Sequence, residues 1–546
     1  MSPSFCSISP NNMINLKKIK KIHFIGIGGI GISAVARILN DGQHKIIGSD
    51  ATSSEITEQL EQEGIKILIP QSQDNINSDI ELVVYSVAVP VDNIERQSAQ
   101  KLGINQLTYP QLLGLLLKDR YGIGVSGTDG KTTTTAMISK ILIDAGFDPT
   151  VVIGSKVDFL GGNSRVGNNK YFIFESDEYQ KAFLNYKPQI AAITNILADH
   201  LDCYQDLAEI KHTFSQYLKQ VPKGGFVVIN NDDKNSLDVA KGVKTKIITY
   251  GIASQANLMA SNIKLENGQQ IFDLIHDDVN LGQIKLSIPA RYNIYNALCA
   301  ISVAMAVKID FKISQKSLAE FTGTWRRWQK LGKVGDSVII TDYAHTPSAL
   351  SQTISAAKEF YPGQKVLIVF QPHQYNRTKN FFNQFAISFS EADQAIISDI
   401  FYVHGREDPQ DFDVSSKKLA QAANIEYGGD LEQTEELVRQ KINDFNVILI
   451  IGAGDIYNLA KKLISNVIDA KVINDDLDDQ LDFEDELENQ YSDDIERDKS
   501  RKPKVVGAGF AKQKQIIEEN RNFSGTWKAK VKLVDKTKRS NNKSKF

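Results

Sequence analysis

Short runs of apolar and β-branched residues recur along this chain, and stretches with helical character separate them. Examples are residues 22–27, 171–176 and 365–370. Strands that alternate with helices in this way favour parallel sheets with helices on their faces. The chain has 546 residues, more than one hydrophobic core usually organises. The pattern therefore predicts an α/β protein of several domains.

Three groups of strands and helices follow one another, and we predict a domain for each: residues 18–117, 118–330 and 331–465. Beyond residue 465 an acidic stretch is followed by a basic one, and large apolar residues are few. Such a segment cannot bury enough surface to offset the entropy of ordering it. We therefore predict a disordered charged tail over residues 466–546, with an unknown partner.

Composition narrows the function classes. The net charge is −3, which does not favour binding to nucleic acid. Cys6, Cys203 and Cys299 are far apart, so a disulfide framework or a thiolate zinc site is not supported. The first residues lack the apolar core of a signal peptide. No apolar run reaches the roughly 18–20 residues of a membrane span. We expect a cytoplasmic protein without membrane insertion.

A candidate phosphate loop lies between a strand and a helix. Its glycines would let backbone amides face phosphates, Lys131 would reach the β- and γ-phosphates, and Thr132 would bind Mg²⁺. Val125 stands where the general pattern has glycine. The predicted nucleotide-binding segment consists of Gly127, Thr128, Asp129, Gly130, Lys131, Thr132 and Thr133.

Asp129 is unexpected in such a loop. A carboxylate about 5 Å from one phosphate charge costs about 3 kcal/mol at an effective dielectric near 20. Asp129 must therefore point away, bind a cation or weaken ATP binding.

Two polar clusters follow neighbouring strands. The first is Glu175–Glu178, and the second includes Asn195, Asp199 and His200. Ligands bind at the carboxyl ends of strands in open α/β sheets. Carboxylates with an occasional imidazole suit a divalent cation that neutralises phosphate charge. Beside a phosphate loop, the two clusters indicate a metal site.

These segments resemble the Mur ligase family of ATP-dependent carboxylate–amine ligases. The loop GTDGKTT, the segment ESDE and the segment TNILADHLD carry the resemblance. It implies a Rossmann-like UDP-binding domain, a central P-loop ATPase domain and a C-terminal Rossmann-like domain. It also implies that Thr132, Glu175 and His200 bind Mg²⁺, and that Lys131 and His200 take part in catalysis.

Further matches extend the resemblance over about residues 20–465. The segment YNIYNA places Asn293 and Asn296 near adenine, although Tyr292 replaces the family's usual histidine. The segment TWRRW offers Arg326 or Arg327 to the γ-phosphate, and Arg327 is the predicted catalytic residue. The segment TDYAHTP implies that Asp342 contacts the ribose and that His345 faces the reaction centre.

The first strand leads into Gly26-x-Gly28-x-x-Gly31, and Asp50 follows nineteen residues later. Taken alone, this fingerprint suggests a nicotinamide dinucleotide. The family resemblance instead implies that the loop holds the pyrophosphate of a UDP-sugar. The predicted UDP-sugar site consists of Gly28, Gly29, Ile30, Gly31, Asp50 and Ser86.

The resemblance implies that ATP and Mg²⁺ drive the joining of L-alanine to UDP-N-acetylmuramate, through an acyl phosphate, in peptidoglycan precursor synthesis. His373 and Arg377 would form the amino-acid pocket. Three alternatives stay open. A preformed peptide could replace L-alanine. Asp129 and Tyr292 motivate a non-catalytic, nucleotide-binding regulatory protein. A nicotinamide dehydrogenase ranks last, because it leaves the phosphate loop unexplained.

Overall fold

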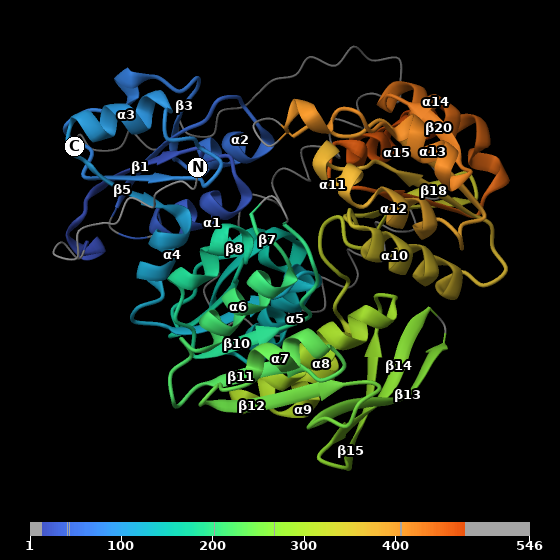
Figure 1. Ribbon diagram of the computed structural model, residues 1–546, viewed down its shortest axis with the longest axis horizontal. Coiled ribbons are helices and arrows are strands. Elements are labelled where there is room, and N and C mark those ends of the chain that lie inside the picture. The colour runs from blue at the N-terminus through green and yellow to red at the C-terminus, as the bar shows by residue number, and fades with distance from the viewer. Residues whose placement is uncertain are drawn as a thin grey trace, which may run out of the picture. The chain divides into compact units, whose positions relative to one another are not determined.

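The computed structural model describes residues 14–474, apart from 41, 43, 201–202, 267 and 404–406. In this part of the chain the main strands form separate sheets, one in each of the three predicted domains (Figure 1). The predicted α/β class is therefore confirmed. Among the described residues, no helix combines the length and the apolar character that a membrane span requires.

The first sheet is parallel throughout. Its elements are β1 (Lys21–Ile25), α1 (Ile30–Asn40), β2 (Lys45–Ser49), α2 (Glu55–Gln62), β3 (Lys66–Leu68), β4 (Leu82–Tyr85), α3 (Ile94–Lys101), β5 (Asn105–Thr108) and α4 (Tyr109–Leu116). The strand order is β3-β2-β1-β4-β5. The order reverses at β1, so the ends of β1 and β4 flank a switch point of the kind at which α/β sheets bind ligands.

The second sheet has a parallel centre and antiparallel strands at both ends, β13–β15 at one end and β8 at the other. Its elements are β6 (Tyr121–Ser126), α5 (Lys131–Asp144), β7 (Thr150–Val157), β8 (Gly162–Arg165), β9 (Tyr171–Glu175), β10 (Ile190–Ile193), α6 (Leu207–Leu218), β11 (Phe226–Asn230), α7 (Lys234–Ala240), β12 (Lys246–Gly251), β13 (Leu258–Glu266), β14 (Gln269–His276), β15 (Val279–Leu286), α8 (Arg291–Ala306) and α9 (Phe311–Ala319). The order is β15-β14-β13-β12-β11-β10-β6-β9-β7-β8. β6 lies between β10 and β9, and the two polar clusters follow these neighbouring strands. Both clusters therefore lie next to the phosphate loop, which follows β6.

The third sheet is parallel except for β16 at its edge. Its elements are β16 (Gln329–Val334), β17 (Ser337–Asp342), α10 (Pro347–Phe360), β18 (Val366–Phe370), α11 (Tyr375–Asn380), α12 (Phe382–Ser388), β19 (Gln394–Ser398), α13 (Ser416–Ala423), β20 (Glu426–Gly429), α14 (Leu431–Lys441), β21 (Val447–Ile451) and α15 (Ile456–Asn474). The order is β16-β17-β21-β18-β19-β20. The continuous apolar sequences of β18 and β21 are buried throughout, as expected for strands covered on both faces.

The last helix, α15, crosses the predicted domain boundary at residue 465 and ends at Asn474. The boundary itself stays a prediction. The rest of the predicted tail, residues 475–546, lies outside the described residues.

The β7–β8 pair contacts the first sheet's helices. The Asn163 side chain donates to the carbonyl of Ile30 and accepts from Arg37 Nη1 at 2.9 Å. Lys156 Nζ lies 2.7 Å from Glu55 Oε1. The start of α1, which follows the glycine-rich loop, is therefore bonded to the domain that carries the phosphate loop.

Candidate active site

The phosphate loop joins β6 to α5, and its backbone requires glycine at two points. Gly127 and Gly130 have φ of +133° and +84°, in the region that favours glycine. A Cβ at Gly127 would meet the Thr194 hydroxyl, and one at Gly130 would meet the Asn296 side chain. The main chain of the loop therefore packs closely against Thr194 and Asn296. It leads into the N-terminus of α5, where the binding of an anion is favoured.

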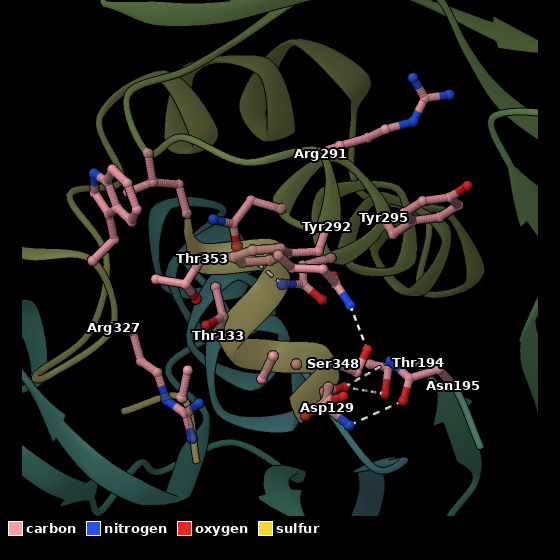
Figure 2. Close-up of a pocket in the computed structure, with 18 of the residues that line it drawn as sticks. Asp129, Thr133, Thr194, Asn195, Arg291, Tyr292, Tyr295, Arg327, Ser348 and Thr353 are labelled. Atoms are coloured by element: carbon pink, nitrogen blue, oxygen red, sulfur yellow. Dashed lines mark hydrogen bonds between the residues drawn. The ribbon is translucent and has the colours of Figure 1, made fainter. Parts of the chain in front are cut away.

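Asp129 is held by the loop that follows β10. Its amide donates to Asn195 Oδ1 at 3.0 Å, and its carbonyl accepts from Thr194 Oγ1 at 2.6 Å (Figure 2). Burial raises the pKa of the Asp129 carboxyl, and the charges of Lys131 and Arg327 oppose this shift. The carboxyl thus stays near the site, where two cations partly compensate its charge.

Lys131 opens α5 and pairs with a buried carboxylate. Its Nζ donates to Glu178 Oε1 at 2.9 Å and to the Gly127 carbonyl at 2.6 Å. Burial lowers the pKa of Lys131, but the charges of Glu178 and Asp177 outweigh it and raise that pKa. Burial raises the pKa of Glu178 to about 8, although Lys131 opposes the shift. The pair therefore holds protons more tightly than either side chain does in water.

The predicted metal ligands fall into two adjoining groups. Thr132 Oγ1 donates to Glu175 Oε2 at 3.2 Å. His200 instead lies with Asp177 and Glu178, and one ligand atom from each of these three residues lies within 4.8 Å of the others. Burial lowers the pKa of His200, which favours the neutral imidazole that binds metals. A hydroxyl, three carboxylates and one imidazole fit a divalent cation such as Mg²⁺.

A cavity of about 490 Å³ opens beside the phosphate loop. Its walls come from the second and third sheets' domains (Figure 2). The predicted site residues that line it are Asp129, Gly130, Thr133, Asn293, Asn296, Arg327 and Asp342. Asn296 Nδ2 donates to Asn293 Oδ1 at 3.0 Å, and Thr134 donates to Asn296 Oδ1 at 3.2 Å. The two predicted adenine-contacting amides are therefore held in place by hydrogen bonds within the protein.

The structure separates the two adjacent arginines. Arg327 lines the cavity. Arg326 has φ of +57°, and its Nη2 donates to the carbonyls of Gly452 and Gly454. Its guanidinium also lies 5.0 Å from the centre of the Tyr343 ring. Arg326 is thus bonded to the backbone of the third domain, while Arg327 lies 4.7 Å from the centre of the same Tyr343 ring and lines the cavity.

Asp342, predicted to contact the ribose, is bonded to the backbone. Its oxygens accept from the Trp328 amide at 2.8 Å and from the Ala344 amide at 2.8 Å. Burial raises the pKa of this carboxyl, and Arg327 opposes the shift. The carboxylate of Asp342 therefore lines the cavity and also holds, through the Trp328 amide, the backbone next to Arg327.

Sequence reasoning missed several residues of the cavity wall. Tyr292 and Thr353 lie side by side there, and Tyr295 and Arg291 come from the same helix as Tyr292 (Figure 2). Burial and the charge of Asp342 raise the pKa of Tyr292. The departure at Tyr292 was visible in the sequence. Thr353, on α10, carried no local signal, because its position depends on packing between domains.

The predicted amino-acid residues, His373 and Arg377, belong to the third domain. They lie near Asp199, which is next to His200 of the predicted metal site. Arg377 Nη2 lies 3.5 Å from Asp199 Oδ1, and Arg377 Nη1 lies 3.4 Å from His373 Nδ1. The His345 and His373 ring centres are 6.0 Å apart. His345 Nδ1 lies 2.9 Å from the Tyr343 carbonyl, so Nδ1 carries the proton and Nε2 is the acceptor.

The predicted UDP-sugar residues gather at the switch point of the first sheet. Gly28 donates its amide to Asp50 Oδ2 at 2.7 Å, and the Ala51 amide donates to Asp50 Oδ1 at 2.8 Å. Ser86 follows β4, and a Cβ on Gly29 would lie 3.9 Å from its hydroxyl. Asp50 therefore fixes the glycine-rich loop that leads into Ile30 and Gly31, at the N-terminus of α1.

Three family descriptions match successive parts of the chain. The Mur ligase family catalytic domain matches residues 21–121, the Mur ligase middle domain matches residues 125–304, and the Mur ligase glutamate ligase domain matches residues 326–454. These matches together cover most of the part of the chain that the structure describes.

Curated relatives match over nearly their whole length. The UDP-N-acetylmuramate–L-alanine ligase of Caldanaerobacter subterraneus subsp. tengcongensis is 41% identical over 458 residues, which are 83% of this chain and 98% of the relative. The protein of the same name from Aquifex aeolicus is 38% identical over 451 residues, which are 83% of this chain and 98% of that relative.

Solved structures share the fold. A UDP-N-acetylmuramate–alanine ligase from Thermotoga maritima matches with a TM-score of 0.71 and 27% identity, covering 83% of this chain and 100% of that one. A murein peptide ligase from Psychrobacter arcticus matches with a TM-score of 0.64 and 24% identity, covering 82% and 98%, which shows the fold alone. The expected three-domain architecture is confirmed, and the chain belongs to the Mur ligase family.

Proposed function

We propose that this chain uses ATP and Mg²⁺ to join L-alanine to UDP-N-acetylmuramate in peptidoglycan precursor synthesis. One observation carries the proposal: Lys131 pairs with Glu178, His200 lies 3.8 Å from Glu178, and Asp199, next to His200, pairs with Arg377 of the third domain. The phosphate loop that carries Lys131 also lines a cavity of about 490 Å³, through Asp129 and Gly130. Relatives that bear this activity as their name, at up to 41% identity, support it. We propose that the reaction takes place in the cytoplasm, where its nucleotide substrates would be available.

In the first step, a carboxylate oxygen of the sugar acid attacks the γ-phosphorus of ATP. The new P–O bond gives an acyl phosphate, and the bond to the β-phosphate oxygen breaks, which releases ADP. Lys131 and Arg327 stabilise the charge that develops on the phosphoryl oxygens. Lys131 Nζ donates to Glu178 and to the carbonyls of Gly127 and Thr128, so a bound phosphate would take over one of these donors.

Thr132, Glu175 and His200 would hold Mg²⁺, with Glu178 beside them. Bound there, the cation neutralises the crowded negative charge of the phosphates and the attacking carboxylate. Asn293 and Asn296 would contact the adenine, and Asp342 would contact the ribose.

In the second step, the amine of the amino acid attacks the acyl carbon. The C–N bond forms, the nitrogen passes one proton to His345 Nε2, and inorganic phosphate leaves with the C–O bond electrons. His345 faces this region with an unprotonated Nε2, and His373 and Arg377 hold the amino acid. Enclosure by the third domain would exclude water from the acyl phosphate.

The glycine-rich loop at the first switch point would bind the UDP pyrophosphate. Gly28, Gly29, Ile30 and Gly31 lead into the N-terminus of α1, where anions are favoured. Ser86 follows the neighbouring strand, and Asp50 fixes the loop.

The test is ATP-dependent phosphate release with UDP-N-acetylmuramate across a panel of amino acids, with the amide product detected by mass spectrometry. A preformed peptide that begins with L-alanine joins the panel, and Lys131→Ala is the inactive control. We expect L-alanine to give product and Lys131→Ala to give none. Product from the peptide alone would favour the peptide-adding alternative, and no product from any amine would refute the ligase.

A further inference from the structure

A carboxyl group is buried inside the first domain, next to two other polar side chains. Glu95, at the start of α3, is fully buried, and so are His23 of β1 and Ser49 of β2. The Ser49 hydroxyl donates to Glu95 Oε2, and His23 Nε2 lies 3.3 Å from the same oxygen. An ionised carboxyl group costs much free energy to bury unless hydrogen bonds compensate it. The proposed reaction gives no role to any of these three residues.

The second oxygen of Glu95 accepts from a different part of the chain. Oε1 accepts from the Asn75 side chain at 2.6 Å and from the Ser72 amide at 3.2 Å, both in the segment that follows β3. Burial raises the pKa of this carboxyl, but the hydrogen bonds from His23, Ser49 and Asn75 outweigh burial and lower that pKa. The ionised carboxylate therefore joins β1, the end of β2 and the segment after β3.

Serine, histidine and a carboxylate are also the residues of a nucleophilic triad, but this geometry excludes that role. In a triad the histidine bonds the hydroxyl with one ring nitrogen and the carboxylate with the other. Here His23 presents the same nitrogen, Nε2, to Ser49 Oγ and to Glu95 Oε2, at 3.3 Å from each. Full burial also keeps the three side chains from contact with a substrate. The group therefore acts by holding the backbone around it in place.

The backbone that Glu95 holds leads directly into the predicted UDP-sugar site. The Ser49 carbonyl accepts from the Gly26 amide at 2.8 Å. The next residue, Asp50, accepts from the Gly28 amide at 2.7 Å. The glycine-rich loop is thus bonded to residues 49 and 50, and the side chain of residue 49 is bonded to Glu95.

We infer that Glu95 is a positioning residue for the nucleoside diphosphate part of the UDP-sugar, and that it acts by holding Ser49 and the segment after β3 at the switch point of the first sheet. The inference rests on the proposed function, because it takes a UDP-sugar as the ligand of the first domain. In dinucleotide-binding folds the pyrophosphate lies at the glycine-rich loop, and the ribose lies beside the acidic residue after the second strand. Both of these elements depend on the backbone at Ser49.

Glu95→Gln tests this role with little change in side-chain volume. An amide has one accepting oxygen, whereas the carboxylate has two. The new nitrogen would face either the Ser49 hydroxyl and His23 or the Ser72 amide and Asn75. One of these two sets of donors would lose its acceptor, so one of the two connections would be weakened.

The experiment measures the binding of UDP-N-acetylmuramate, UDP and Mg-ATP to the full chain by calorimetry. The variants are Glu95→Gln and Ser49→Ala, and the second removes the donor to Glu95 while keeping the carbonyl of residue 49. Leu82→Ala is the matched control, because Leu82 is fully buried in the same sheet at the start of β4, at the opposite end of that strand from Ser86. Urea unfolding measures the stability of each variant.

We expect Glu95→Gln to raise the Kd for UDP-N-acetylmuramate and for UDP about tenfold or more, as the loss of hydrogen bonds to a charged group does. Ser49→Ala should raise both constants by a smaller factor. The Kd for Mg-ATP should stay unchanged in both variants. Leu82→Ala should lower stability and leave all three constants unchanged, because it leaves the bonds of Glu95 intact.

Two results would overturn the inference. Glu95→Gln could fold and bind UDP-N-acetylmuramate as tightly as the wild type does, or Leu82→Ala could weaken that binding as much as Glu95→Gln does, as a purely structural role requires. If Glu95→Gln does not fold, the same comparison between Ser49→Ala and Leu82→Ala decides.

The proposed function fails separately from this inference. A wild-type chain that binds UDP-N-acetylmuramate but forms no amide product would refute the ligase, and the binding constants of the variants would still decide the role of Glu95. A folded wild-type chain that binds neither UDP-N-acetylmuramate nor UDP would overturn the inference itself.

Discussion

Lys131 and Glu178 form a buried ion pair, and substitution of one partner should destabilise the protein more than substitution of the other. The nitrogen and the nearer oxygen are 2.9 Å apart, and the side chains are 16% and 4% exposed. At an effective dielectric near 20, two unit charges at this distance attract by about 6 kcal/mol. Desolvation cancels much of this, and removal of one partner of a buried pair costs about 3–5 kcal/mol.

Lys131→Met should bear this full cost above about pH 8, where Glu178 is ionised. It leaves Glu178 buried beside Asp177, without a counter-charge. Glu178→Gln should cost only about 1–2 kcal/mol, because Lys131 keeps the carbonyls of Gly127 and Thr128 as acceptors. The double variant should recover most of the loss of Lys131→Met.

Urea unfolding followed by circular dichroism measures these differences. Lys140→Met is the matched control, because Lys140 lies on the same helix and pairs with Asp144 at 2.8 Å nearer the surface. A surface pair of this kind contributes less than about 1 kcal/mol. Equal losses for Lys131→Met and Glu178→Gln, or losses that simply add in the double variant, would refute the reasoning.

The same pair predicts a pH dependence. The pKa of Glu178 is about 8 in the folded protein, against 4.5 in the unfolded chain. Between these values the folded protein binds a proton that the unfolded chain has released, so this group makes stability fall as pH rises through the window. Lys131→Met raises that pKa further. The stability difference between Lys131→Met and wild type should therefore be smaller at pH 5.5 than at pH 8.5, and a constant difference would contradict the assignment.

Three further outcomes are expected. Arg326→Ala should destabilise the protein by about 2–3 kcal/mol, because the carbonyls of Gly452 and Gly454 lose their donor. Arg327→Ala should lower kcat, and its loss of stability should grow as pH rises, because Asp129 and Asp342 lose a compensating charge; a loss of kcat in Arg326→Ala alone would exchange the two roles. Asp129→Asn should tighten ATP binding in calorimetry, because up to about 3 kcal/mol of repulsion is removed, and weaker binding would mean that the carboxylate holds a cation instead. Chelation by EDTA should abolish phosphate release and excess Mg²⁺ should restore it, while activity in EDTA would remove the metal from the reaction.

Local patterns predicted the parts of the site that one strand and its loop determine. The phosphate loop and the clusters at Glu175 and His200 follow strands whose apolar sequences are unmistakable, and parallel pairing then brings their ends together. The α/β class follows from the same strands. The glycine-rich loop at Gly28 was found for the same reason.

What the sequence left undecided depends on contacts between distant segments. The choice between Arg326 and Arg327 follows from the left-handed backbone at Arg326 and from carbonyls more than a hundred positions away. The pairing of Lys131 with Glu178 and the division of the metal ligands into two groups likewise require coordinates. Propensity and spacing carry no information about such contacts.

The cavity beside the phosphate loop, where we propose that ATP binds, has walls from the second and third domains. Asn293 and Asn296 lie on α8, which packs into the core of the second domain, whereas Asp342 and Thr353 belong to the third domain. Recombination between relatives that exchanged only one of these domains would pair unmatched halves of a single pocket. Chimaeras joined near residue 330 would therefore fold each core and still lose affinity for ATP. This junction is thus a poor place to recombine sequences. Substitutions that compensate one another should be sought across it.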